Sequence, residues 1–562
     1  MKRILAFALV ACLLAGCGSR NKELPAMQPE AITVPAETVA VTEKAAEKIS
    51  YSSRFDAVTE ITLSDAGIVV DDEAETESVY TSRDIIYYED KDTYESGNPY
   101  GEAEAWEKHT QLEADSHTVV NITAPGAYRL SGKLSAGQIR VDLGEDAYDD
   151  PNAVVELILS DVDISCAVAP AILYLNVYEC DGAWSADTAK STVDTSDAGA
   201  NLVLEGKNIV TGSHVAKIFK DQDEEKKLWK QDGAIYSYMS MNVFGPGKLD
   251  LTADNEGLDT ELHLTINGGD IAIRSDNDGI NTNEDGVSVT TINGGNVHIM
   301  AGLGAEGDGI DSNGYLVING GTVVAAANPG ADAGLDSDLG SFINGGTVIA
   351  LGSAMDWAES DSEQVTMNLQ FAAQQSSDAA VVVTRQDGTV LFAYDPSADE
   401  VLAENKRAYS GAVISCGNFR VDETYHVYVD GEVSGEVHGG IYDVTTVTGY
   451  SGGTQMAYTG TDVVRRPGGF GGMPEEFDPN NLPEDMKRGE RPEMPENVTP
   501  DGQPDGVEPP KNFAPGQKPE GMEPPEGMKF HGSMEFDSEP GATNSEFYMQ
   551  DKVNFFSGLT KA

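Results

Sequence analysis

Basic residues are scarce in this sequence. Its 562 residues include 36 Lys and Arg against 94 Asp and Glu, which gives a formal net charge of -58. No stretch interleaves Lys or Arg with aromatic residues, and nucleic acid would be repelled by such a chain at long range. Nucleic acid is therefore excluded as a partner, and the acidic balance favours cations instead.

Long apolar runs are also lacking, except at the start. Lys2 and Arg3 precede an apolar run from Ile4 to Leu14, which is typical of a secretory signal and too short to span a bilayer as a mature helix. The run ends in Leu14-Ala15-Gly16-Cys17, which resembles a bacterial lipobox; an ordinary secretory signal is the alternative. Residues 1–17 are predicted to be the signal peptide and lipobox, with Cys17 lipidated and the protein extracytoplasmic, lipid-anchored to the cell membrane and displayed at the cell surface.

Cysteine is rare, with five residues in the chain. Beyond the signal and Cys17, only Cys166, Cys180 and Cys416 remain. Cys166 and Cys180 could pair outside the cytoplasm, but a sequence cannot show that two Cβ atoms meet, so the bridged and the reduced states both stay open.

Glycine and proline are abundant by contrast, with 60 and 25 residues, and they help to mark the domain boundaries. Residues 18–57 are predicted to be a flexible tether, because they are rich in Ala, Glu, Thr and Pro without apolar periodicity. Residues 58–365 are predicted to form the main domain, 366–446 a β-rich C-terminal segment, and 447–562 a disordered tail rich in Pro, Gly, Met and Glu. The aromatic residues Phe547 to Phe556 are interpreted as a sticky end of that tail, with a short docking segment as the alternative.

An internal repeat fills the main domain. Asn-Gly-Gly recurs at steps of 26, 26 and 25 residues, each time between β-type runs, at Asn267, Asn293, Asn319 and Asn344. Periods of this size indicate a solenoid, whereas calcium rolls repeat every nine residues and propeller blades need ~40 or more. Two short strands and a tight glycine corner in each repeat predict an all-β fold, a right-handed parallel β-helix.

Acidic motifs keep approximate pace with this repeat. They read "DNEGLDT", "DNDGINTNED", "GDGIDSN" and "DAGLDSD", and their shared glycines are 22, 30 and 25 residues apart. Residues one repeat apart would stack at ~4.8 Å, where two carboxylates repel by roughly 0.9 kcal/mol in water. One row is predicted to hold Asp259, Asn281, Asp311 and Asp336, and a second to hold Glu256, Asp278 and Asp308, interrupted by Ala333.

Such rows need counterions, and hard oxygen ligands beside glycine-rich turns suit Ca²⁺. A soft-metal site is excluded, because the region has no cysteine and its two histidines, His263 and His298, are interpreted as strand-face residues. The alternative is that the acids are solvated corners and the asparagines an ordinary stacking ladder. The predicted calcium ligands are Asp254, Glu256, Asp259, Asp276, Asp278, Asn281, Glu306, Asp308, Asp311, Asp332, Asp336 and Asp338.

These motifs together carry a family resemblance. "KQDGAIYS" (residues 230–237), followed by "GPGKLDL", "DNDGINTNED", "NGGNVHI" and "GDGIDSNG", resembles the bacterial calcium-binding parallel β-helix family of carbohydrate-binding domain-containing proteins, in the pectate-lyase-like superfamily. The likeness covers roughly residues 58–445. It implies calcium along the repeats and binding of cell-wall polysaccharide, such as cellulose or pectin-type polygalacturonate, without catalysis.

Catalysis is not expected from the residues themselves. A lyase that acts on uronates needs Arg or Lys as a base beside the metal, and between residues 231 and 384 only Lys248 and Arg274 are basic. Arg274 is interpreted as a surface residue, and the aspartate and histidine signatures of polygalacturonases are missing. A pectate-lyase-like polysaccharide lyase stays open as an alternative, as does a structural or adhesive envelope protein in which the repeats serve as a spacer.

Aromatic residues near the repeats are the candidate sugar contacts, although each could equally be packed at a strand end or in a loop. The predicted function is thus calcium-stabilised, non-catalytic binding of a neutral or an acidic polysaccharide by a surface lipoprotein; no protein partner is identified. The candidate contacts are Trp229, Tyr236, Tyr315 and Trp357.

Overall fold

The computed structural model describes residues 51–87, 109–182, 186–218, 229–353, 355–461 and 543–562. In these parts the chain is almost entirely β, with one short α-helix, α1 (Gln111–Asp115), and a few 3-10 turns such as η2 (Glu145–Asp149). The predicted all-β class is confirmed. No helix within the described ranges is long and apolar enough to cross a membrane.

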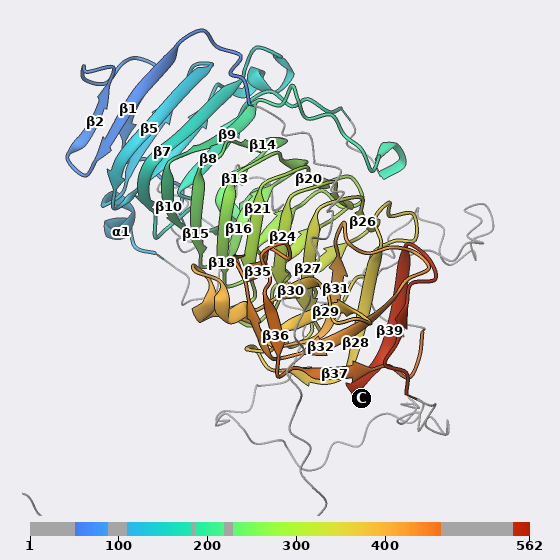
Figure 1. Ribbon diagram of the computed structural model, residues 1–562. Coiled ribbons are helices and arrows are strands. Elements are labelled where there is room, and N and C mark those ends of the chain that lie inside the picture. The colour runs from blue at the N-terminus through green and yellow to red at the C-terminus, as the bar shows by residue number, and fades with distance from the viewer. Residues whose placement is uncertain (1–50, 88–108, 183–185, 219–228, 354, 462–542) are drawn as a thin grey trace, which may run out of the picture.

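A nine-stranded sheet runs the length of the main domain (Figure 1). Its strands pair in parallel in chain order, apart from one antiparallel strand, β3 (Val79–Ser82), at its N-terminal edge. The parallel strands are β4 (Thr118–Ile122), β6 (Gly137–Asp142), β8 (Ile172–Asn176), β13 (Gly233–Ser237), β16 (Glu256–Thr260), β19 (Ile280–Thr282), β22 (Ile310–Ser312) and β25 (Leu335–Ser337).

Two further parallel ladders accompany this sheet. The second ladder contains β9 (Ala200–Glu205), β14 (Met241–Phe244), β17 (Leu264–Ile266), β20 (Val289–Ile292), β23 (Tyr315–Ile318) and β26 (Gly340–Ile343). The third ladder contains β10 (Lys207–Gly212), β15 (Lys248–Ala253), β18 (Asp270–Ser275), β21 (Asn296–Met300), β24 (Thr322–Ala326) and β27 (Thr347–Gly352).

From β13 onward each repeat contributes one strand to the nine-stranded sheet, one to the second ladder and one to the third, in that order. At the N-terminal end the second and third ladders merge, because β7 (Val155–Ser165) pairs with both β9 and β10. Beyond it lie β5 (Gly126–Leu134), β1 (Val58–Ser64) and the hairpin partner β2 (Gly67–Val70). A separate antiparallel pair joins β11 (Val215–Ile218) to β12 (Trp229–Gln231).

Apolar side chains stacked across the repeats explain this arrangement. In the nine-stranded sheet the register aligns five aliphatic residues that are at most 1% exposed. Each buried aliphatic side chain contributes about 1.5–3 kcal/mol, and neighbouring strands bury them in one continuous core. The five are Ile235, Leu258, Ile280, Ile310 and Leu335.

The Asn-Gly-Gly corners lie between the second and third ladders. Their asparagines form a side-chain ladder, in which Asn293 Nδ2 donates to Asn267 Oδ1 at 2.9 Å and Asn319 Nδ2 donates to Asn293 Oδ1 at 2.9 Å. Asn344 continues it at 3.0 Å. The second glycine of each corner has positive φ, +87° at Gly295, and a Cβ there would meet the Gly269 carbonyl oxygen at 2.7 Å. The asparagine side chains therefore stabilise the corners by bonding to one another from repeat to repeat.

The C-terminal unit begins at residue 366 and packs against the last repeats (Figure 1). Strand β31 (Tyr409–Ser415) pairs antiparallel with β27 of the third ladder and with β28 (Thr366–Gln375). The other strands are β29 (Val381–Arg385), β30 (Val390–Tyr394), β32 (Thr424–Val429), β33 (Glu432–Ser434), β34 (Val437–His438), β35 (Ile441–Tyr442), β36 (Gly449–Ser451), β37 (Thr454–Ala457), β38 (Phe547–Tyr548) and β39 (Val553–Lys561).

The predicted disordered tail over 447–562 is wrong wherever the structure describes it. Residues 449–457 form β36 and β37, and β39 pairs in parallel with β28. Phe547 is 0% and Phe556 2% exposed, with ring centroids 4.9 Å apart, because an extended aromatic segment buries more apolar area against the sheet than in water. The docking alternative is the observed one. Residues 462–542 lie outside the described part of the chain.

The predicted tether over 18–57 likewise ends too late. Tyr51 Oη and Ser53 Oγ each donate to Glu156 Oε2 at 2.5 Å, and Arg54 N donates to Glu156 Oε1 at 2.9 Å. The nearly buried Glu156 carboxylate thus holds residues 51–54 against the sheet. Residues 1–50, including the lipobox, lie outside the described residues.

Candidate metal centre

The first row of acidic residues is aligned as predicted. Cα pairing in the nine-stranded sheet places Asp259 opposite Asn281, Asn281 opposite Asp311, and Asp311 opposite Asp336. Each follows one of the inward-facing aliphatic residues, and successive side chains of a strand point to opposite faces. The first row therefore points away from the apolar core, one side chain per strand.

The second row lies three residues earlier in each repeat. Main-chain bonds run from Gly257 N to Asp278 O at 2.9 Å and from Gly279 N to Asp308 O at 3.0 Å, which aligns Glu256, Asp278 and Asp308. Asp308 N donates to Asp278 Oδ1 at 2.6 Å. At the interruption, the main-chain N–H of Ala333 donates to Asp308 Oδ1 at 2.5 Å.

Glycine separates the two rows because space is lacking there. A Cβ at Gly279 would lie 2.1 Å from Ile299 Cγ2 and 2.6 Å from the Gly309 carbonyl oxygen. The repeats approach so closely at this point that no side chain fits. This contact explains the Gly in each acidic motif and brings both rows close to the main chain.

Two residues that the sequence did not single out complete one end of the rows. Asp232, Glu256 and Asp259 are all buried, and each offers a carboxylate oxygen within 4.8 Å of the others. Lys230 Nζ forms an ion pair with Asp232 Oδ2 at 2.9 Å. The motif "QDGAIY" has one residue more between the acid and the row position than the later motifs have, so spacing alone did not reveal Asp232.

Lys230 remains a cation in this setting. Burial lowers the pKa of its ammonium group, but the charges of Asp232, Asp259 and Glu256 outweigh burial and raise the pKa above its usual value. One ammonium group faces three carboxylates here, so it neutralises only part of their charge.

Three oxygens of the rows are buried without any hydrogen-bond donor. They are Glu256 Oε2, Asp259 Oδ2 and Asn281 Oδ1, and their residues are at most 5% exposed. A buried acceptor left unpaired costs about 1–3 kcal/mol, and more when it is charged. The residues present thus fit a cation bound by oxygen ligands.

Burial and mutual repulsion hold protons on these carboxyl groups when no cation is bound. Burial, followed by the charges of neighbouring row members, raises the pKa of Asp308 to about 8 and that of Asp311 to about 7. The same causes raise the pKa of Asp259 and of Asp278 well above the usual value. A divalent ion would compete with these protons.

The remaining predicted ligands lie outside the rows. Asp332 is half-buried and accepts from Gly307 N at 3.0 Å, beside the second row. Asp254 is exposed and already accepts from Ser213 Oγ at 2.6 Å and pairs with His214 at 3.0 Å. Asp276, Glu306 and Asp338 are also exposed. The structure brings together Glu256, Asp259, Asp278, Asn281, Asp308, Asp311 and Asp336.

The four candidate sugar contacts differ in accessibility. Tyr236 is 0% exposed and donates from Oη to Glu261, and Trp357 is 5% exposed and packed against Phe555, so neither ring can stack on a sugar in this structure. Tyr315 is half-buried, with its ring centroid 6.1 Å from that of Phe342. The side chain of Trp229 lies outside the described part. Of the three candidate rings that the structure describes, only that of Tyr315 is partly accessible.

Cys166, Cys180 and Arg274 were also singled out by the sequence, for a disulfide and for a catalytic base. Cys166 and Cys180 form no disulfide in the structure. Arg274 lies on the third ladder, where Nη1 donates to Asp250 Oδ1 at 2.7 Å and to Thr252 Oγ1 at 2.9 Å. Its guanidinium is occupied by these partners, on a different ladder from the acid rows.

These features define a class: an all-β repeat protein with a buried array of carboxylates and amides along one sheet. A family model described as "Carbohydrate-binding domain-containing protein" matches residues 116–449, which is more than half of the chain, and the chain belongs to this family.

A relative from Acetivibrio thermocellus with the same description is 30% identical over 161 residues. That match covers 28% of this chain and 46% of the relative, so the chain matches less than half of the relative's length. A solved structure titled as a polysaccharide lyase-like protein from C. thermocellum, in a gadolinium derivative, is 20% identical. It covers 52% of this chain and 93% of its own, with a TM-score of 0.30.

Proposed function

We propose that this protein binds a polysaccharide without cleaving it, on a right-handed parallel β-helix that calcium stabilises. The regular succession of one strand in each of three parallel ladders supports the β-helix. The right hand follows the rule for crossovers between parallel strands. Membership of a carbohydrate-binding family supports the ligand class.

The single observation that carries the calcium assignment is the set of buried, unpartnered oxygens at Glu256, Asp259 and Asn281. Calcium accepts ~6–8 oxygen ligands in flexible geometry, which suits carboxylates, amides and main-chain carbonyls supplied by successive repeats. When bound, calcium would neutralise the row and offer a coordination position to an acidic sugar. Residues of both rows would hold it, and Lys230 would limit the charge at one end.

The sugar would lie beside the acid rows, against the half-buried aromatic pair of Tyr315 and Phe342. Tyr315 opens β23 four residues after Asp311, and Ser312 Oγ donates to the Tyr315 carbonyl oxygen at 2.8 Å across that corner. An aromatic ring offers a sugar an apolar face, and a nearby divalent ion offers its carboxylate a ligand position. This combination favours polygalacturonate-type chains over neutral ones.

Retention on immobilised polygalacturonate is expected in millimolar Ca²⁺ and lost with chelator. Tyr315→Ala should weaken binding ~3–10-fold, the equivalent of one aromatic contact, whereas Tyr80→Ala, an exposed tyrosine on β3, should not. Affinity is measured by depletion of protein from the supernatant. Equal binding to cellulose with and without chelator would instead favour a neutral glycan, and no binding on a glycan array in either condition would favour a spacer protein.

A lyase is the second candidate, since Lys230 lies beside the acid rows. A general base must be unprotonated to accept a proton, however, and the acids around Lys230 keep its ammonium group charged. The residue acts better as a counterion than as a base.

Incubation with polygalacturonate and Ca²⁺ is therefore expected to yield no unsaturated product that absorbs in the near ultraviolet. Lys230→Met and, as a control, Lys133→Met at an exposed ion pair should leave the trace equally flat. Absorbance that grows with protein concentration and disappears only in Lys230→Met would establish a lyase.

Surface anchoring is proposed through Cys17. Because one acyl chain binds membranes only marginally and lipoproteins carry several, removal of the acylated residue should release the protein completely. Cys17→Ser is expected to shift the protein from the membrane fraction to the medium, as measured by fractionation and immunoblotting. Membrane retention of this variant would contradict a lipoprotein.

A further inference from the structure

A second cluster of metal-binding side chains lies where the C-terminal unit covers the third ladder. Asp270 opens β18, His298 lies in β21, and His438 ends β34 of the C-terminal unit. His298 pairs in register with Ala272 on one side and Val324 on the other, two residues that pack in the C-terminal core. The cluster is therefore on the opposite side of the third ladder from the main core.

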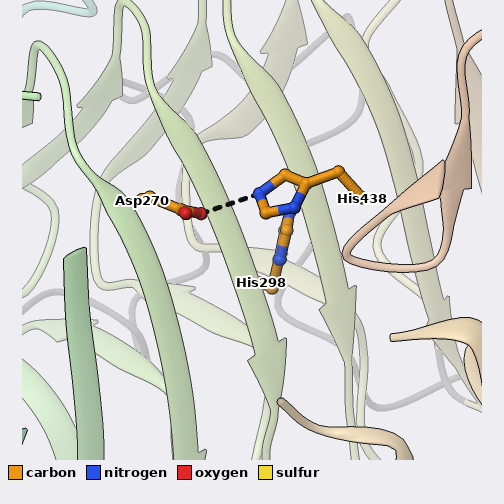
Figure 2. Close-up of side chains that lie close together, drawn as sticks. All are labelled: Asp270, His298 and His438. Carbon is orange, nitrogen blue, oxygen red and sulfur yellow. Dashed lines mark hydrogen bonds and ion pairs between the residues drawn. The ribbon is translucent and has the colours of Figure 1, made fainter. Parts of the chain in front are cut away.

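The three side chains converge closely. Each offers a ligand atom within 4.8 Å of the other two. His438 Nε2 lies 2.9 Å from Asp270 Oδ1, and the two imidazole centroids are 5.2 Å apart. Figure 2 shows the His298 ring below that of His438, with the Asp270 carboxylate to the left and joined to His438 by its hydrogen bond.

Each imidazole has its Nδ1 beside a further carboxylate. His438 Nδ1 pairs with Glu400 Oε1 at 2.5 Å, and His298 Nδ1 lies 3.9 Å from Asp399 Oδ2. Metal-bound histidines commonly place their second nitrogen against such a carboxylate, which orients the ring. His298 Nε2 has no hydrogen-bond partner, and the partner of His438 Nε2 is Asp270 Oδ1, so an ion between the three side chains would take the place of that hydrogen bond.

Two buried polar atoms at the cluster have no hydrogen-bond partner. His298 is 3% exposed and its Nε2 has no hydrogen-bond partner, and Asp399, also 3% exposed, has Oδ2 without one. A buried polar atom without a partner lowers the stability of the fold. The site is also closely packed. A Cβ at Gly439 would come 1.7 Å from His298 Cε1, so only glycine fits there.

We propose that Asp270, His298 and His438 form a binding site for a first-row divalent transition metal, of which zinc is the best match. Two imidazoles and a carboxylate are ligands that zinc accepts and calcium does not prefer. A tetrahedral zinc with bonds of ~2.0–2.1 Å holds its ligands ~3.3 Å apart, so the side chains need to close by ~1.5 Å at most. The His438 side chain, 40% exposed, has room to move.

Such an ion would fasten the C-terminal unit to the third ladder, because its ligands come from both. Glu400 would act as a positioning residue for His438. Lys248, which pairs with Asp270 Oδ2 at 2.6 Å, leaves Oδ1 to the metal.

The test uses the full chain in millimolar Ca²⁺, so that sites made only of oxygen ligands are already filled. Titration with Co²⁺, followed by displacement with Zn²⁺, is expected to give one equivalent of a visible absorption band typical of nitrogen ligation. His438→Ala and Asp270→Asn should weaken binding at least tenfold, and Glu400→Gln about tenfold. His426→Ala, a half-buried histidine of β32, is the matched control and should bind like the unaltered chain.

Zinc should also raise the unfolding midpoint of the unaltered chain and of His426→Ala but not of His438→Ala. Since His438 is partly exposed, its replacement is expected to leave the calcium-loaded fold intact, as circular dichroism would check. No absorption band, or a band unchanged in both His438→Ala and Asp270→Asn, would overturn the site. Polysaccharide retention, measured separately, would not be affected by that outcome.

Discussion

Addition of millimolar Ca²⁺ to the chelator-treated protein is expected to raise its unfolding midpoint by at least about 5 °C. A ligand that binds only the folded state stabilises it by ~2.7 kcal/mol at a hundredfold excess over its dissociation constant, and each further site adds to this. For a folded unit of this size, 1 kcal/mol corresponds to roughly 2 °C. Mg²⁺ should substitute poorly, because it retains its waters and demands octahedral geometry. Differential scanning calorimetry measures the shift.

Asp308→Asn distinguishes a calcium site from a merely acidic surface. In Ca²⁺ the substitution should lower the midpoint, because a charged ligand is lost. In chelator it should leave the midpoint unchanged or slightly higher, because it removes a buried carboxyl group that without a cation either repels Asp311 and Asp336 or has to hold a proton. Asp149→Asn, at an exposed position in η2, should change neither. A midpoint that ignores both calcium and chelator would mean that the acids are solvated corners.

The metal-free protein is expected to be more stable at pH 6.5 than at pH 8.5, by about 2 kcal/mol or more. In the folded state Asp308, with its pKa raised to about 8, and Asp311, with its pKa raised to about 7, bind protons in this window. In the unfolded chain an aspartate has a pKa of ~3.9 and binds none. The folded state thus holds more protons, and its stability falls as pH rises from 6.5 to 8.5.

Urea unfolding in metal-free buffer at the two pH values measures this difference. The window stays at or above pH 6.5 because burial lowers the pKa of His263 and of His298, whose protonation in the unfolded chain would oppose the effect at lower pH. Asp308→Asn should remove most of the pH dependence, and Ca²⁺ should suppress it, since the metal-bound carboxylates stay ionised. Stability that rises with pH in metal-free buffer would contradict the raised pKa values.

The rows were predictable because their information is periodic. Asp259, Asn281 and Asp311 follow glycine at a fixed distance, and a parallel pairing of repeats aligns residues at equal distances from such a marker. Asp232 was missed because one extra residue shifts it out of that spacing. Lys230 was missed with it, because it lies one residue before the region from 231 to 384 in which only Lys248 and Arg274 are basic.

Contacts between distant segments were not predictable in the same way. His298 and His438 are 140 residues apart in the chain, although their rings lie side by side. Neither histidine is followed or preceded by another candidate ligand at a spacing typical of metal sites. Tyr236 lies in register with Asp259 but one repeat earlier, and its complete burial depends on neighbouring strands that its own sequence context does not reveal. Similarly, the apolar content of residues 547–556 was visible, but the sheet edge that receives it was not.

Because residues 553–561 pair with β28 and β37, the described structure holds the chain on both sides of residues 462–542. Tyr458 and Asn544 exchange main-chain hydrogen bonds, 2.9 Å in each direction, so this stretch leaves the sheet and returns to the same place. Residues 462–542 therefore connect two neighbouring points of the described structure. Each doubling of the length of chain between two fixed points adds only about 0.6 kcal/mol to the entropic cost of joining them, so insertions between residues 461 and 543 should change stability little. The last twenty residues have no such freedom, since they complete a core.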